Sequence, residues 1–385
     1  MLVLWKNCDV YAPAHLGLRD ILIEGEKIAA VGEDLSAWEQ VPQITVRDLG
    51  GAVVCPGLID LHVHVTGGGG EQGPASRTPE LQLTDFTRNG VTSVVGLLGT
   101  DGISRSVENL LVKCRALEEE GITTWMLTGN YRQPSPTLTG DVQRDVALID
   151  KVIGVKLALA DHRSSHVTPQ ELARLGAEAR VGGMLGGKPG LVVVHMGAAS
   201  RCMQTLFRAL EDADLPPQNI LPTHCCRTPE LVADAVRFNR MGGTIDFTAD
   251  LPESETGVAP VVCRAMEQGA DPARITISSD AGGSQPSFND KGECIGLGTT
   301  TSATLLQELR RLVQREGLPL EQALAFFTAN PARVLGQSGK KGTVAPGADA
   351  DLLALDDKFA VLQLLACGRE AICDGVPVLK GKFEA

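Results

Sequence analysis

Apolar and β-branched runs recur at intervals through the middle of the chain. Each has the length of a buried strand, and a more polar stretch separates it from the next. The eight runs are Val53 to Ile59, Thr92 to Leu98, Thr123 to Leu127, Val152 to Leu159, Leu191 to His195, Asn219 to Thr223, Gly243 to Thr248 and Arg274 to Ser278. The pattern therefore predicts eight buried strands.

Segments with helical spacing lie between these runs. Ser106 to Glu119 has apolar residues at helical intervals, and Thr168 to Glu171 opens another helix with an N-cap residue, a proline and an acid. Thr228 to Glu230 and Asp271-Pro272 provide similar starts. Strands alternating with helices in this number predict an α/β fold, a (β/α)8 TIM-like barrel. A doubly wound open sheet is the alternative, but no GxGxxG turn follows the first strand.

The two ends of the chain have a different pattern, with short alternating segments broken by turns. These segments are Asp20 to Gly25, Lys27 to Gly32, Gly342 to Val344, Asp351 to Leu355 and Ala371 to Gly375. Both groups predict β-hairpins. We expect one small β-sandwich domain built from residues 1–52 and 340–385, with the barrel of residues 53–339 inserted between them.

Composition and charge exclude several classes of partner. The chain has 35 Lys and Arg against 47 Asp and Glu, and a formal net charge of −12. Since there is no Lys/Arg-rich run, we expect neither nucleic acid nor a membrane as partner. No apolar run approaches the roughly 20 residues of a spanning helix, and Met1 to Val10 lacks the apolar region of a signal peptide. The ten cysteines are scattered without a CxxC pair, so we expect a reduced, cytoplasmic protein.

The predicted strand ends carry residues that bind metals. Barrel active sites lie at the carboxyl ends of the strands, and four of the seven histidines fall there. His62 and His64 are two apart on an extended chain, so both rings point to one side and can chelate a metal. A packed or solvated pair is the alternative for these two alone. Because His195, His224 and Asp280 end three further strands, a metal site is the favoured interpretation.

Lys156 and Asp280 extend this site. Lys156 lies within the apolar run Val152 to Leu159, where an ammonium is costly unless it is neutralised or paired. A salt bridge is one interpretation; the other is a carbamate, formed from the amine and carbon dioxide, which is anionic and can bridge two divalent ions. Asp280 would ligate one ion, accept a proton and pass it to the leaving group. A helix N-cap or turn role is the alternative for Asp280.

Three charged residues are expected on loops at the mouth of the barrel. Glu71 follows four glycines, which let the backbone approach a ligand closely. Arg163 and Arg227 follow Lys156 and His224 by a few residues. Each of the three could merely pair with surface charges. Together they suit a substrate with one ammonium and two carboxylates, the charge pattern of a β-linked aspartyl dipeptide.

At this point the sequence resembles a known family. The order of the candidate ligands is similar to that of the binuclear amidohydrolase superfamily, and the glycine run with its acid closely resembles the isoaspartyl dipeptidases. The segments that carry the resemblance are His62 to Glu71, Val91 to Asp101, Thr128 to Tyr131, Val155-Lys156 with Asp161 to Arg163, Pro222 to His224 with Arg227, and Ser278 to Asp280 with Gly283 to Pro286. They span most of the predicted barrel.

The resemblance implies metal-dependent hydrolysis of the β-aspartyl amide bond in L-isoaspartyl dipeptides, which releases L-aspartate and an amino acid. It implies two divalent ions bridged by carboxylated Lys156 and a hydroxide. We expect zinc, since nitrogen-rich sites favour it, although other divalent metals stay open. The implied metal ligands are His62, His64, Lys156, His195, His224 and Asp280.

The resemblance also assigns roles at the substrate. Asp280 would be general base and then general acid, and Tyr131 would hydrogen-bond the carbonyl oxygen as it becomes an oxyanion. A homo-oligomer, an octamer, is implied. Dihydroorotases, hydantoinases and N-acyl-amino-acid deacylases share the metal ligands and are the nearer alternatives; an inactive binding protein on this fold is the more distant one. The implied substrate-binding residues are Gly69, Glu71, Thr100, Tyr131, Arg163, Arg227 and Ser284.

Overall fold

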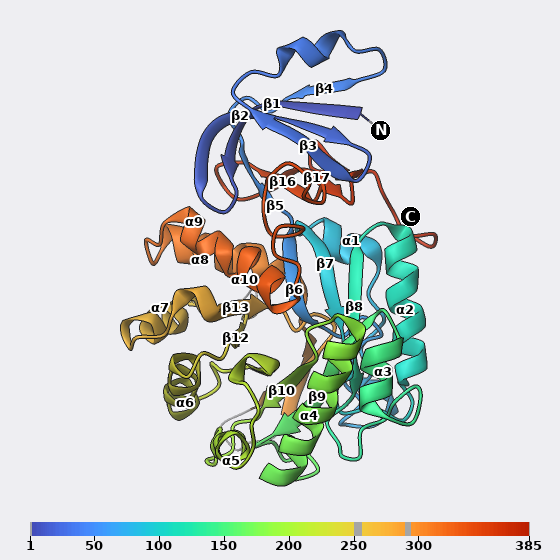
Figure 1. The fold of residues 1–385 in the computed structure, drawn as a ribbon, viewed down its shortest axis with the longest axis vertical. Coiled ribbons are helices and arrows are strands. Elements are labelled where there is room, and N and C mark those ends of the chain that lie inside the picture. The colour runs from blue at the N-terminus through green and yellow to red at the C-terminus, as the bar shows by residue number, and fades with distance from the viewer. Residues whose placement is uncertain (1, 250–255, 289–293, 385) are drawn as a thin grey trace.

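The computed structural model describes residues 2–249, 256–288 and 294–384. A sheet of strands from both ends of the chain lies at one end of the molecule, and parallel strands surrounded by helices form the rest (Figure 1). Among the described residues, no helix is both long enough and apolar enough to cross a membrane.

The central part of the chain is a curled parallel sheet. Strands β6 (Leu58–Val63), β7 (Val91–Gly96), β8 (Thr123–Gly129), β9 (Val152–Leu159), β10 (Leu191–Met196) and β11 (Ile220–Thr223) pair in that order, and β12 (Ile245–Thr248) pairs with β13 (Ile275–Ser278). The backbone N–H of His64 donates to the carbonyl of Ala281 at 2.8 Å, so the segment after β13 lies beside β6. The predicted TIM-like arrangement of parallel strands is therefore confirmed.

Helices cover the outside of the sheet. The helix predicted over Ser106 to Glu119 is observed as α2, and Ser106 caps it by accepting a hydrogen bond from the backbone N–H of Asn109 at 3.2 Å. Asp271-Pro272, by contrast, opens only a 3-10 turn, because β13 begins three residues later. The helices are α1 (Leu83–Thr87), α2 (Val107–Glu120), α3 (Val142–Leu148), α4 (Pro169–Gly186), α5 (Gln204–Asp212), α6 (Pro229–Arg240), α7 (Ala259–Glu267), α8 (Ala303–Gln314), α9 (Leu320–Ala325) and α10 (Ala329–Val334).

Strands from both termini share one sheet, as predicted. Its order is β19-β18-β17-β16-β5-β1-β2-β3, with β4 beside β1, and antiparallel pairing of β5 with β16 joins the two halves. A separate hairpin of β14 (Ser284–Phe288) and β15 (Cys294–Thr299) follows the barrel strands. The strands of the terminal sheet are β1 (Leu2–Tyr11), β2 (His15–Glu24), β3 (Lys27–Gly32), β4 (Thr45–Asp48), β5 (Val53–Pro56), β16 (Leu352–Leu355), β17 (Val361–Ala366), β18 (Arg369–Cys373) and β19 (Val376–Pro377).

Two glycines mark where the observed strands differ from the prediction. The run Val53 to Ile59 is divided at Gly57 into β5, which belongs to the terminal sheet, and β6. Gly57 donates to the carbonyl of Asp351 at 2.9 Å, and a Cβ there would collide with Thr92. The predicted strand Gly342 to Val344 is wrong, because Gly342 takes a turn conformation with φ +69°.

An apolar floor lies under the carboxyl ends of the barrel strands. Leu191 and Val193 precede His195 by four and two residues, so they share its face of β10. Both are buried in one cluster with Leu221 from the neighbouring strand β11 and Leu127 from β8. The polar strand-end residues therefore rest on a layer of packed apolar side chains.

Candidate active site

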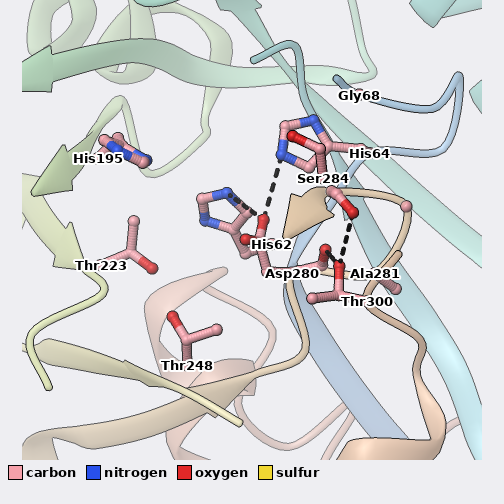
Figure 2. A network of polar contacts seen from close by, with 12 residues as sticks. His62, His64, Gly68, His195, Thr223, Thr248, Asp280, Ala281, Ser284 and Thr300 are labelled. Carbon is pink, nitrogen blue, oxygen red and sulfur yellow. Dashed lines mark hydrogen bonds and ion pairs between the residues drawn. The ribbon is translucent and has the colours of Figure 1, made fainter. Parts of the chain in front are cut away.

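Six predicted ligands meet at the carboxyl ends of the barrel strands. The four histidine rings form a continuous series in which neighbouring ring centroids lie 5.6 Å (His64 and His62), 4.9 Å (His62 and His224) and 4.5 Å (His224 and His195) apart. Figure 2 shows Asp280 beside His62 and His64, with His195 on the opposite side. One ligand atom each of His62, His224 and Asp280 lies within 4.8 Å of the others, so this group can hold a metal ion.

The Asp280 carboxylate is placed for ligation and is not satisfied by hydrogen bonds. Its Oδ1 lies 3.2 Å from His64 Nε2 and 3.4 Å from His62 Nε2. Asp280 Oδ1 and His64 Nδ1 are buried, and neither has a hydrogen-bond partner in the described part of the chain. Burial raises the pKa of Asp280, but the neighbouring imidazoles lower it more, so the pKa is well below its ordinary value. Unpartnered buried donor atoms of this kind fit a metal.

Lys156 is fully buried at the centre of the group. Its Nζ lies 3.0 Å from His62 Nε2, and burial lowers the pKa of the amine to about 7. No described carboxylate lies within ion-pair distance of it, so the salt bridge considered from the sequence is not present among these residues. Burial therefore favours the neutral, nucleophilic form of this amine.

Hydrogen bonds orient two of the rings. His224 Nδ1 lies 2.6 Å from Thr248 Oγ1, and His195 Nε2 lies 3.0 Å from Asp161 Oδ2. Both ring nitrogens of His195 have partners, because the Tyr131 hydroxyl faces Nδ1. His224 and Asp280 have positive φ angles of 61° and 56°, so the strand ends turn sharply where these ligands are presented.

The Glu71 carboxylate is held by three donors on the rim of the cavity. Thr100 Oγ1 and Arg163 Nη1 donate to Oε1 at 3.1 and 3.0 Å, and Ser284 Oγ donates to Oε2 at 3.1 Å. Partial burial raises the pKa of Glu71, but these donors and the arginine charge lower it more. Gly69 precedes Glu71 with φ +75°, and a Cβ there would collide with the carbonyl of Ser76.

Tyr131 and the arginines lie beside His195. The Tyr131 hydroxyl is 2.6 Å from His195 Nδ1, and burial raises the pKa of Tyr131 above its ordinary value. Arg163 lies over the Tyr131 ring at 5.4 Å from its centroid. Arg227 Nη1 lies 3.2 Å from His195 Nε2. Two guanidinium groups and one hydroxyl thus face the same side of the metal-ligand group.

A cavity of about 1000 Å³ joins these features. His64, His195, His224 and Asp280 line it, whereas His62 and Lys156 lie beneath its floor. Glu71, Thr100 and Ser284 form one polar end. Its lining also includes Ala198, Cys226, Ala249, Val258 and Val261, which make part of the cavity surface apolar.

Comparison with known proteins assigns the family. A model of the amidohydrolase family matches residues 53–378. The chain belongs to the amidohydrolase family. A dihydroorotase from Lactobacillus johnsonii is 23% identical to this amidohydrolase over 91% of its chain and 88% of the relative. The resemblance to the superfamily that the sequence predicts is confirmed.

Two solved structures are much more similar to this amidohydrolase. Both are β-aspartyl dipeptidases from Fervidobacterium islandicum AW-1. Each match covers 98% of this chain and 98% of the dipeptidase chain. The structure in complex with a β-Asp-Leu dipeptide has 42% identity and a TM-score of 0.91; the other has 40% identity and a TM-score of 0.90. The resemblance to isoaspartyl dipeptidases is therefore confirmed over nearly the whole length.

Asp161 is a residue of this amidohydrolase site that the sequence interpretation missed. Its side chain is 4% exposed, and Oδ1 accepts from the backbone N–H and Nε of Arg163 at 2.8 and 2.9 Å. Oδ2 lies 3.0 Å from His195 Nε2 and 3.6 Å from Arg227 Nη1. Asp161 therefore holds one candidate metal ligand and two candidate substrate residues at once. The feature of the sequence that could have identified Asp161 is its position just beyond the end of β9 and two residues before Arg163.

Proposed function

We propose that this amidohydrolase is a β-aspartyl dipeptidase that releases L-aspartate from L-isoaspartyl dipeptides. The observation that carries the proposal is one anchored carboxylate, Glu71, in the same cavity as Arg163, Arg227 and the metal-ligand group. The similarity to a structure that holds β-Asp-Leu supports the same substrate class.

The charges in the cavity match such a dipeptide. Glu71 would take the α-ammonium, with Gly69, Thr100 and Ser284 around it. Arg163 and Arg227 would take the two carboxylates, since a guanidinium binds a carboxylate through paired N–H donors. An α-linked dipeptide without an acidic side chain offers one carboxylate fewer and leaves one arginine without a partner.

His62, His64, Lys156, His195, His224 and Asp280 would hold two zinc ions, with Lys156 as a carbamate between them. The carbamate forms when the neutral amine adds to carbon dioxide, making an N–C bond and releasing one proton. The absence of a described carboxylate paired with Lys156 supports this. When bound, the ions would supply an activated water and a Lewis acid for the amide carbonyl.

Two side chains would act on the reacting atoms. Asp280 is ionised, because its pKa is well below the ordinary value, so it can accept a proton and later give it to the departing amine. The Tyr131 hydroxyl stays protonated at neutral pH and can donate a hydrogen bond to the carbonyl oxygen as negative charge develops.

We also propose the finer features of the fold and setting. The eight strands β6 to β13 would close into a (β/α)8 barrel, supported by the bridge between Val63 and Ala281. Residues 1–52 and 340–385 would form a separate small β-sandwich domain. A cytoplasmic homo-oligomer, an octamer as in the isoaspartyl dipeptidases, is proposed; Met184 and Leu185, each 70% exposed on α4, would offer an apolar contact.

Amine release from β-Asp-Leu tests the function, with α-Asp-Leu as comparison substrate and a chelator as control. Dihydroorotate is the second comparison substrate, and its ring opening is followed by ultraviolet absorbance because it releases no amine. We expect turnover of β-Asp-Leu at least about 100-fold faster than of the others, which is about 2.7 kcal/mol in the transition state. The chelator should abolish it. Faster turnover of dihydroorotate, or turnover unaffected by metal removal, would reject the proposal.

A further inference from the structure

Arg105 lies beneath the loop that carries Glu71, away from the cavity wall. It stands directly before Ser106, the N-cap of α2, and is 5% exposed. Its Nη2 donates to the carbonyls of Thr78 at 2.6 Å and Gly68 at 3.2 Å. Its Nε is buried without a hydrogen-bond partner, and no carboxylate within the described ranges pairs with the guanidinium.

A buried guanidinium without a carboxylate is an expensive choice for a structural position. Removing a charge from water costs several kcal/mol, on the order of the stability of a small domain, unless good partners offset it. Burial and the charge of Arg77 lower the pKa of Arg105 accordingly. An apolar side chain could fill the same volume at less cost. What arginine adds is a charged Nη2 whose two N–H groups bind two carbonyl oxygens at once, held in direction by the planar guanidinium.

Those two carbonyls form the base of the loop from residue 68 to residue 78. The backbone N–H of Thr78 donates to the carbonyl of Gly68 at 3.0 Å, and the N–H of Gly68 donates to Thr78 Oγ1 at 2.7 Å. Gly70 N–H donates to the carbonyl of Ser76 at 3.1 Å further along. Glu71 lies at the far end of this narrow loop. The position of its carboxylate therefore depends on how Gly68 and Thr78 are held at the start and end of the loop.

The same base is tied to the opposite side of the site. Thr78 Oγ1 donates to the carbonyl of Gly282 at 2.6 Å, and Gly68 N–H donates to it at 2.8 Å. In the sequence, Gly282 lies two residues after Asp280 and two before Ser284. Ser284 Oγ donates to Glu71 Oε2 at 3.1 Å. A Cβ on Gly67 would lie 2.8 Å from Arg105 Nη1, so the backbone rests directly on the guanidinium.

We propose that Arg105 is a positioning residue for recognition of the substrate ammonium. By holding the carbonyls of Gly68 and Thr78 together, it fixes where the Glu71 carboxylate stands. It touches neither the metal-ligand group nor the cavity. The inference rests on the proposed function, because it assumes that Glu71 binds the α-ammonium of a β-aspartyl dipeptide.

The test compares β-Asp-Leu with N-succinyl-leucine, the same molecule without the α-amine. Arg105→Met keeps most of the side-chain volume and removes every donor. Arg105→Lys keeps the charge but not the planar fork. Arg115→Met, at an exposed position on α2, is the matched control. KM and kcat are measured for both compounds, N-succinyl-leucine serving as competitive inhibitor if its turnover is too slow, and bound metal is measured by mass spectrometry.

In Arg105→Met we expect KM for β-Asp-Leu to rise about tenfold, with kcat within about threefold and metal content unchanged. The preference for β-Asp-Leu over N-succinyl-leucine should fall about tenfold, and much less in a Glu71→Gln background, because both changes disturb one contact. Arg105→Lys should show a smaller loss in the same direction, and it decides the question if the methionine variant does not fold.

An unchanged preference in a folded Arg105 variant would overturn the inference. So would a loss that occurs only together with loss of metal, or an equal loss in Arg115→Met. Failure of the wild type to cleave β-Asp-Leu would instead reject the proposed function, so the two failures are distinguishable.

Discussion

The Glu71 carboxylate is fully provided with donors before a substrate arrives. Arg163, Thr100 and Ser284 occupy both of its oxygens, and its pKa is lowered, so it is anionic at neutral pH. A substrate ammonium would join this network and share the negative charge with Arg163. Recognition then depends on charge, since a glutamine in this place keeps one acceptor oxygen but loses the negative charge that attracts the ammonium.

Glu71→Gln should therefore lower kcat/KM for β-Asp-Leu by about 100-fold, since a charged hydrogen bond contributes about 1.5–3 kcal/mol. The same substitution should change N-succinyl-leucine by less than about threefold. Steady-state kinetics with both compounds checks this, with Glu80→Gln as a control on the exposed surface. An equal fall for both compounds would show that Glu71 does not recognise the amine.

Asp161 has two roles in the geometry, because it holds His195 and both arginines. Removing its charge in Asp161→Asn should weaken metal affinity about 10- to 100-fold, as loss of a carboxylate behind a ligating histidine does. Chelator-competition titration measures this, with Asp150→Asn at an exposed position as control. Unchanged metal affinity would mean that Asp161 serves the arginines alone.

At the scale of elements, helix α4 begins with a capping box. Thr168 Oγ1 accepts from the backbone N–H of Glu171 at 3.3 Å, and Glu171 Oε2 accepts from the N–H of Thr168 at 2.8 Å. Thr168→Ala should lower the free energy of unfolding by about 1 kcal/mol. Urea denaturation measures it. Gln170→Ala, in the same exposed turn, should change it by less than about 0.5 kcal/mol, and equal effects would contradict the capping role.

Strands β11, β12 and β13 bring a carboxylate into the barrel interior. Asp246 is buried and accepts from Thr223, Thr276 and Ser278 at 2.7, 2.7 and 2.6 Å. Burial nevertheless raises its pKa to about 6. The folded state therefore prefers protonated Asp246. The stability that Asp246 contributes is fully present below its unfolded pKa of about 3.9 and is lost as pH rises through about 6.

The Asp246→Asn variant should not lose stability in this way as pH rises, since an amide does not titrate. In chelator-treated protein, stability of the variant relative to wild type should increase by about 2–3 kcal/mol between pH 4 and pH 7.5. Comparing the two proteins at each pH cancels the other titrating groups. A relative stability that is flat across this range would show that Asp246 ionises normally.

The sequence predicts elements best where local chemistry decides them. Thr168 caps its helix as expected, and seven barrel strands begin within about two residues of their predicted starts. The division at Gly57 could not be predicted, because it depends on pairing with a strand some 300 residues later. Asp161 was missed for the same reason: its importance comes from His195 and Arg227, which other strands bring to it.

At the scale of the molecule, the metal-ligand group joins side chains from five barrel strands or the turns after them. Metals bound there bind only the folded chain, and they stabilise it by about 4 kcal/mol when their free concentration is 1,000 times Kd. Chelation should therefore lower Tm measurably and abolish hydrolysis together. Calorimetry with and without chelator checks this, with zinc added back as control. An unchanged Tm would show that no metal stabilises the folded protein.

The pairing of β5 with β16 also sets an order of events during synthesis. Strands β1 to β5 leave the ribosome first, yet the neighbour that covers the β5 edge is made only after the whole barrel. Until then the sheet has an open edge, which is a place where other chains can attach. A translational pause or premature stop before Leu352 would leave that edge without its partner strand. Aggregation of such fragments would begin at β5.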